Sequence, residues 1–66
     1  MKFIVVHKDT VLFTTSNFNY AFAWLTEYAR ECKLIFWTSA HHRGREDVTY
    51  YDGNDTYYDF AIIREE

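Results

Sequence analysis

Cysteine, glycine and proline are scarce in this sequence of 66 residues, which contains one, two and none of them. Because Cys32 is alone, an intramolecular disulfide and a multi-cysteine metal site are excluded, and a reducing compartment is indicated. Gly44 and Gly53 are too few for a glycine-rich phosphate-binding loop. The sequence also lacks a long apolar run and a charged-apolar-small leader, so we expect no transmembrane helix, no signal peptide and a soluble cytoplasmic protein.

Residue patterns typical of catalysis are missing as well. Cys32 falls on the apolar stripe of an expected helix, where a small buried side chain is far more common than a reactive thiolate. Ser16 and Ser39 have no flanking glycine of the kind that forms a nucleophile elbow. A chain of this length also leaves little room for an enclosed pocket, unless one forms between subunits. We therefore expect a protein that is not an enzyme and that holds no cofactor.

Aromatic residues, in contrast, are abundant, at 21% of the chain. Residues 1–66 suffice for one small domain, and a domain of this size buries too little surface to be more than marginally stable without support. With disulfides and multi-cysteine metal sites excluded, oligomerisation remains as that support. Aromatic side chains also carry more area than a single helix covers, so we expect some of them to face a partner.

Charge is divided unevenly along the chain, although the net charge is only −3. Residues 1–45 hold six basic and three acidic side chains, whereas residues 46–66 hold one basic and seven acidic, which gives +3 and −6 for the two parts. This division argues against nucleic-acid binding over the whole surface, because such binding needs a broad basic area. It favours a basic partner at the acidic end.

The hydrophobic pattern predicts the element order ββαβββ. Residues 2–7 and 11–15 are β-prone runs on either side of a short polar turn, which indicates an opening hairpin. An amphipathic helix of about four turns follows, capped by Ser16 and with a core stripe at three- and four-residue spacing. The stripe consists of Phe18, Ala21, Phe22, Leu25, Ala29 and Cys32.

Three further strands complete the predicted pattern. Residues 34–38 are too short and too rich in β-branched and aromatic residues for another helix, so they indicate a strand. Residues 41–45 are expected to form a polar loop, and a final hairpin ends in the apolar run 60–63. We predict an α+β fold with one amphipathic helix on one face of an antiparallel sheet of four to five strands. The expected helix-to-sheet contacts join Phe18, Phe22, Leu25 and Ala29 to Phe60 and Ile62.

Apolar residues alternate on both sides of the expected strands, as Phe3 and Val5 do against Ile4 and Val6. One helix covers one face of the sheet, and contiguous exposed apolar patches are rare on monomers. The other face must then be lined by a partner, by a second copy of the chain or by the large tyrosines. Of these we expect a second copy, in a two-fold homodimer.

The stretch 49–59 is the most informative part of the sequence, because tyrosine and aspartate recur on both arms of an expected hairpin. Gly53-Asn54 indicates a two-residue loop between β-prone runs. The resulting pairing, with side chains alternating along each strand, predicts one acidic and aromatic face and one core face. The first holds Val48, Tyr50, Asp52, Asp55, Tyr57 and Asp59, and the second holds Thr49, Tyr51, Thr56, Tyr58, Phe60 and Ile62.

We interpret the acidic and aromatic face as a partner-binding surface. Tyrosine supplies contact area at little entropic cost, and aspartates along a strand pair present negative charge to a basic protein. The simpler alternative is a solvated face whose aspartates discourage edge-to-edge aggregation. The predicted partner-binding residues are Tyr50, Asp52, Asp55, Tyr57 and Asp59, with Tyr20 and Trp24 at the border of the helix as a second patch.

The segment 41–45, with two adjacent histidines and two arginines, carries an alternative interpretation. Adjacent histidines can reach a metal ion, but Cys32 or His7 would have to supply a third ligand, so a solvated loop is favoured and no metal site is expected. Such a loop beside strand aromatics also suits a small nucleic-acid-binding domain, although two acidic residues follow at once. The nucleic-acid-binding residues in that case are His41, His42, Arg43 and Arg45.

Together these features favour a small regulator or inhibitor that acts by binding a protein with a basic surface. A bacteriophage-encoded inhibitor of a host protein and an antitoxin-like protein are examples of this class. Nucleic-acid binding through segment 41–45 is the second hypothesis.

Overall fold

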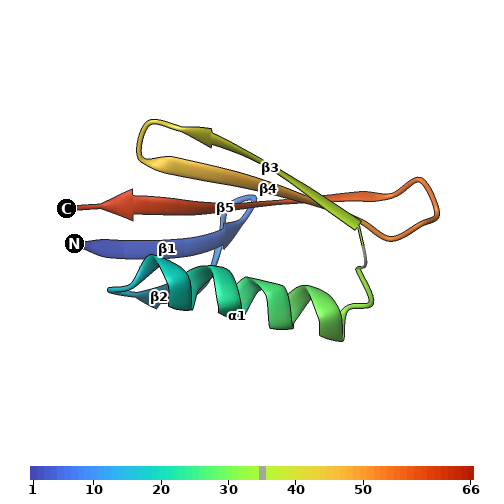
Figure 1. Cartoon of the computed structure of the whole chain (residues 1–66), viewed down its shortest axis with the longest axis horizontal. Coiled ribbons are helices and arrows are strands. Elements are labelled where there is room, and N and C mark those ends of the chain that lie inside the picture. The colour runs from blue at the N-terminus through green and yellow to red at the C-terminus, as the bar shows by residue number, and fades with distance from the viewer. Residues whose placement is uncertain (35) are drawn as a thin grey trace.

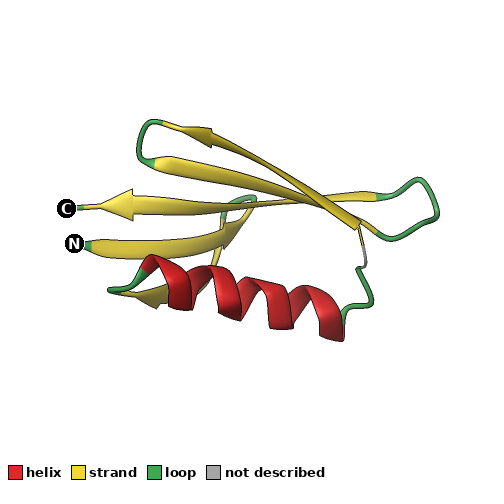
Figure 2. Ribbon diagram, in the orientation of Figure 1, coloured by secondary structure: helices red, strands yellow, loops and turns green. Residues whose placement is uncertain are grey.

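The computed structural model describes residues 1–34 and 36–66 of the chain. In this part of the chain, five antiparallel strands form one sheet in the order β2-β1-β5-β4-β3, and the helix lies along one face of it (Figures 1 and 2). The predicted α+β fold and the order ββαβββ are confirmed. The elements are β1 (Lys2–His7), β2 (Thr10–Thr15), α1 (Phe18–Glu31), β3 (Phe36–His42), β4 (Arg45–Tyr51) and β5 (Tyr57–Glu65).

A side-chain cap starts the helix. Oδ1 of Asn17 accepts hydrogen bonds from the backbone N–H groups of Asn19 and Tyr20, at 2.8 and 3.2 Å. The carbonyl oxygen of Asn17 also accepts the first helical hydrogen bond, from the N–H of Ala21 at 3.1 Å. The cap is therefore Asn17, and the prediction of Ser16 is wrong by one residue, because the helical hydrogen bonds begin one position later.

The helix ends in a hydrogen-bond pattern of the Schellman type. The backbone N–H of Leu34 donates to the carbonyl of Ala29 at 2.9 Å, and that of Lys33 donates to the carbonyl of Arg30 at 3.0 Å. Lys33 takes the left-handed conformation, with φ 61°, that glycine usually provides at this position. Because the chain leaves the helix here, Cys32 is exposed, and its predicted place on the buried stripe is wrong.

The core lies between the helix and the sheet face that the helix covers. Leu25 has no exposed surface, and Leu25 and Ala29 share one buried cluster with Phe60 and Ile62, as predicted. Phe22 packs against this cluster, whereas Phe18, in the first turn, remains 37% exposed. The buried cluster consists of Val5, Ala21, Leu25, Ala29, Leu34, Val48, Tyr50, Phe60 and Ile62.

Strand β3 lies further along the sequence than residues 34–38, where it was predicted. Leu34 lies beyond α1, where its backbone N–H completes the hydrogen bonds that end the helix, and Ile35 lies outside the described residues. The strand pairs with β4 along its whole length, so the two histidines at its end and Arg45 of β4 are strand residues. The predicted loop at 41–45 is wrong, because cross-strand pairing reduces it to the turn 43–44.

The β4–β5 hairpin pairs one residue out of step with the prediction. Tyr50 lies opposite Tyr58, and the loop spans residues 52–56 instead of the predicted two. Since side chains alternate along a strand, this shift of one residue turns β4 over relative to its predicted facing. Val48 and Tyr50 therefore face the helix and are buried, whereas Thr49 faces away from it.

The sheet face away from the helix, called here the open face, changes in character along its length. Its apolar part lies on β2, β1 and the C-terminal half of β5. Its other end, next to the β4–β5 loop, is called here the aromatic end. The apolar part contains Ile4, Val6, Val11, Ala61 and Ile63, and the aromatic end contains Thr38, Thr49, Tyr51, Tyr57 and Asp59.

Candidate functional site

The aromatic end of the open face is organised around two tyrosines from neighbouring strands. Tyr51 ends β4 and Tyr57 begins β5, so the strand register places them directly opposite each other. Their ring centroids are 4.9 Å apart and the rings are inclined by 28°, which makes a stacked pair. Tyr57 is 66% exposed. Tyr51 is half-buried, so the stack presents mainly Tyr57 to solvent on a rigid support, as is common at binding hot spots.

The hairpin loop holds Tyr51 in place. The hydroxyl of Tyr51 donates to Oδ1 of Asp55 at 3.1 Å and accepts from the backbone N–H of the same residue at 3.2 Å. Oδ1 of Asp52 accepts from the backbone N–H of Asn54 at 2.8 Å. Gly53 and Asp55 have positive φ values of 89° and 65°, which bend the chain back towards β5. Both loop aspartates thus have a structural role as well as a charge.

A hollow of about 180 Å³ lies beside the tyrosine pair. Its walls are aromatic rings and hydroxyl groups, and one of these hydroxyls, that of Thr49, donates to Oδ1 of Asp59 at 2.9 Å. A carboxylate therefore lies directly behind one wall. The lining residues are Trp37, Thr38, Thr49, Tyr51 and Tyr57.

The structure separates the predicted partner-binding residues of the hairpin. Tyr57 and Asp59 are exposed on the open face, while Asp52 and Asp55 lie in the loop. The prediction that all of these residues and Tyr50 share one face is wrong, because the hairpin register differs by one residue. Their role in binding stays a prediction.

Tyr50 was predicted to bind a partner at the surface, but the observed strand register places it in the core. It is 3% exposed, and burial raises the pKa of its phenol from 10.0, although a side-chain hydrogen bond with Thr26 acts in the opposite direction. Its neighbour Tyr51, which was predicted to face the core, lies on the open face instead. The sequence did contain a signal for a longer hairpin loop, namely the aspartates on both sides of the Gly-Asn pair. Aspartate side chains favour turns, because they accept hydrogen bonds from nearby backbone N–H groups.

The second predicted patch is only partly available to a partner. Tyr20 is 68% exposed, as expected. Trp24, in contrast, is half-buried in an aromatic stack, with its ring 4.9 Å from that of Phe13 and 5.2 Å from that of Tyr28. The indole therefore mainly joins the helix to β2, and Tyr20 is the exposed member of this patch.

Most of the basic groups in segment 41–45 are paired with carboxylates. Nδ1 of His41 lies 2.9 Å from Oε1 of Glu46, and Asp47 contacts both Nε2 of His42, at 3.5 Å, and Nε of Arg45, at 2.8 Å. The two histidines alternate on β3 and so point to opposite faces of the sheet. Among the described residues, no group of three or more histidines, cysteines or acidic residues is placed to hold a metal ion.

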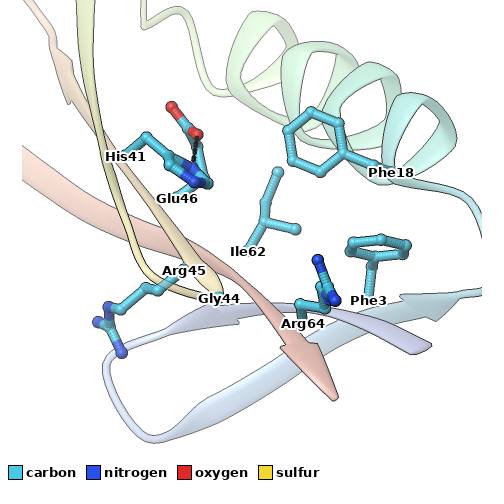
Figure 3. A pocket seen from close by; sticks show the side chains of 8 residues that line it. All are labelled: Phe3, Phe18, His41, Gly44, Arg45, Glu46, Ile62 and Arg64. Carbon is cyan, nitrogen blue, oxygen red and sulfur yellow. Dashed lines mark hydrogen bonds and ion pairs between the residues drawn. The ribbon is translucent and has the colours of Figure 1, made fainter. Parts of the chain in front are cut away.

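A larger hollow, of about 360 Å³, lies by the β3–β4 turn on the helix side of the sheet (Figure 3). Phe3, Phe18 and Ile62 give it apolar walls, and the paired His41 and Glu46 border it on one side. Sequence reasoning missed this hollow, because its residues come from five separate elements and meet only in the folded chain. The remaining lining residues are Gly44, Arg45 and Arg64, of which Arg45 points away from the hollow in Figure 3.

The chemistry of this larger hollow is mixed. The side chain of Glu46 is 16% exposed and places a carboxylate near the apolar walls, while Arg64 adds a guanidinium that also contacts Glu66 at 3.2 Å. An imidazole held by a carboxylate can orient a proton donor or acceptor, but the described lining includes no hydroxyl or thiol for it to activate. With charges of both signs, the hollow selects no single class of ligand.

Comparison with known proteins finds no match to a protein family, to a curated protein or to a solved structure. Within the described residues, no helix has the length and apolar character needed to cross a membrane.

Proposed function

We propose that this chain is a small regulator or inhibitor, without enzymatic activity, that acts by binding a basic surface on another protein. The observation that carries the proposal is the stack of half-buried Tyr51 with exposed Tyr57 within an acidic hairpin. Residues 51–59 include three aspartates and no basic side chain. Rigid aromatic area supplies contact energy, and like-signed charge around it steers an oppositely charged partner.

Nucleic-acid binding is the second candidate function, and the ion pairs of segment 41–45 weigh against it. Binding to phosphates needs basic groups that can exchange their counterions for the nucleic acid. His41, His42 and Arg45 each contact a carboxylate of the same chain, which leaves Arg43 in the turn. Such a small basic area supports at most weak binding.

We further propose that the protein forms a homodimer in the cytoplasm through the apolar part of the open face. Val11 is 60% exposed there, beside partly exposed Ile4, Val6 and Ile63. A second copy would cover this apolar area and leave the aromatic end for the partner. The single cysteine suits a reducing compartment.

Replacing Val11 by Glu is expected to weaken this dimer at least about tenfold, because a buried charge without a partner is costly. Sedimentation equilibrium over a range of concentrations measures the dissociation constant. Tyr20→Glu, on the helix and similarly exposed, is the control and should leave self-association unchanged. Wild-type protein that stays monomeric at high micromolar concentration contradicts the dimer.

The binding function is tested on a partner captured from a bacterial lysate and then purified. Changing Asp52 and Asp55 together to Asn removes charge but keeps the oxygens that accept loop hydrogen bonds, so association should slow and depend less on salt. Tyr57→Ala should speed dissociation by about tenfold, which corresponds to about 1.4 kcal/mol.

Tyr20→Ala tests the second predicted patch in the same experiment, since Tyr20 and Tyr57 are 68% and 66% exposed. Loss of binding with Tyr20→Ala but not with Tyr57→Ala would move the partner-binding surface from the hairpin to the helix. The nucleic-acid hypothesis predicts a different result, namely that the aspartate changes have no effect or help, and that changing Arg43 and Arg45 to Ala abolishes binding. If the aspartate and tyrosine variants bind the purified partner as the wild type does, the hairpin is a solvated surface and the proposed function is wrong.

A further inference from the structure

The hollow beside Tyr51 and Tyr57 is small compared with sites for metabolites. Its volume is about 180 Å³, whereas pockets for drug-sized ligands measure about 300–1,000 Å³. It lies on the exposed open face, where three adjacent strands contribute its walls. A hollow of this size and position fits the end group of one side chain from a docked protein.

The walls of the hollow favour a cation. The face of an aromatic ring is negative and attracts ammonium and guanidinium groups. The stacked rings of Tyr51 and Tyr57 are fixed relative to each other. The hydroxyl of Tyr51 also donates to the Asp55 carboxylate, at 3.1 Å, and this bond increases the electron density of the ring.

The charges around the hollow also favour a bound cation. Asp59 lies behind the hollow, where its Oδ1 accepts from the Thr49 hydroxyl, and the two loop aspartates lie at the end of the hairpin. Two basic groups, Lys8 and Arg45, border a separate hollow that also includes Asp59. Arg45 is engaged there with Asp47, at 2.8 Å. Among the described residues that line the hollow beside the tyrosine pair, none carries a positive charge, so the aspartates set the sign of the local potential.

Among cationic side chains, arginine fits these walls better than lysine. A guanidinium is flat and stacks on an aromatic ring, while its edge still donates several hydrogen bonds in fixed directions. The hollow offers ring faces for stacking and threonine hydroxyls, those of Thr38 and Thr49, as acceptors beside them. A lysine ammonium is a compact, strongly hydrated charge and uses a flat aromatic surface less fully.

We propose that the hollow at the aromatic end binds an arginine side chain of the partner protein, by stacking on Tyr51 and Tyr57 in the field of the hairpin aspartates. This inference rests on the proposed function and identifies the partner group that the binding surface recognises.

The test uses the whole chain and three short acetylated, amidated glycine-rich peptides that differ at one residue, which is arginine, lysine or citrulline. Citrulline has the shape of arginine without its charge. NMR titration should show shifts at Tyr51, Tyr57 and Thr49 that are largest with the arginine peptide and absent with citrulline. Tyr57→Leu keeps apolar area but removes the ring, so it should weaken arginine binding about two- to fivefold.

Glu31→Gln, which removes an exposed carboxylate at the end of the helix, is the matched control for a change of charge and should bind the arginine peptide as the wild type does. Asp59→Asn should also weaken binding. Because this substitution hardly changes the shape of the side chain, it provides a second test if the Tyr57→Leu protein does not fold. Equal shifts with citrulline or lysine, shifts at other residues only, or unchanged binding by Tyr57→Leu would each overturn the assignment.

The outcome separates this inference from the proposed function. If the purified partner depends on Tyr57 but the arginine peptide does not bind, the arginine assignment fails and the proposed function stands. If the arginine peptide binds as described but the partner ignores Tyr57, the hollow recognises arginine and the proposed function fails.

Discussion

Leu25→Ala should lower the free energy of unfolding by about 2–5 kcal/mol, because it removes a large side chain from the centre of the core. Leu25 has no exposed surface and belongs to the cluster that joins the helix to β1, β4 and β5. A chain of this length typically has a stability of about 3–10 kcal/mol. This single truncation is therefore expected to remove a large part of the stability, which urea denaturation followed by circular dichroism would show as a lower midpoint.

Two variants of the same helix serve as controls. Leu25→Met keeps nearly the same volume and should cost less than about 1.5 kcal/mol. Tyr20→Ala removes a side chain that is 68% exposed and should change stability by about 0.5 kcal/mol or less. A Leu25→Ala protein that unfolds at the same urea concentration as the wild type would show that the helix does not pack as described.

The helix and the opening hairpin could be predicted from the sequence because both depend on local patterns. The stripe at Ala21, Leu25 and Ala29 has the helical period, and β1 and β2 are separated by a short polar turn. The errors lie at the ends of the helix. Asn17 takes the cap in place of Ser16, and Lys33 adopts a positive φ, a conformation for which lysine gives no sequence signal.

The register of the last hairpin could not be predicted, because it depends on side-chain hydrogen bonds within its loop. A Gly-Asn pair favours a two-residue loop. Here Asp52 and Tyr51 bind backbone N–H groups inside the loop, and Asp55 takes a positive φ, so five residues are used instead. The difference of one residue reverses the facing of β4 and moves Tyr51, rather than Tyr50, to the open face.

The candidate site was therefore predicted in composition but not in arrangement. The sequence indicated that tyrosines and aspartates of the hairpin form a surface, and Tyr57 and Asp59 do lie together on the open face. The hollow beside them also needs Thr38 and Trp37 of β3, and the position of that strand was predicted too early in the chain. A cross-strand site requires the correct register of every strand that contributes to it.

The observed register of β4 and β5 predicts very different losses of stability when Tyr50 and Tyr57 are truncated, although the sequence analysis placed both on one face. Tyr50→Ala should lower the free energy of unfolding by about 3–5 kcal/mol, the range for buried aromatic residues, since Tyr50 is 3% exposed and its ring lies 5.7 Å from that of Phe60. Tyr57→Ala should cost at most about 1.5 kcal/mol, because only its stacking on Tyr51 is lost.

Tyr50→Phe removes the buried hydroxyl but keeps the ring, so it should cost about 1 kcal/mol and separates the polar group from the packing. Urea denaturation of the three variants gives the comparison directly. If Tyr50→Ala and Tyr57→Ala were equally mild, Tyr50 would be a surface residue and the two-residue loop would be correct. A large loss for Tyr50→Ala alone requires the shifted register, and with it the aromatic end on which the proposed binding surface depends.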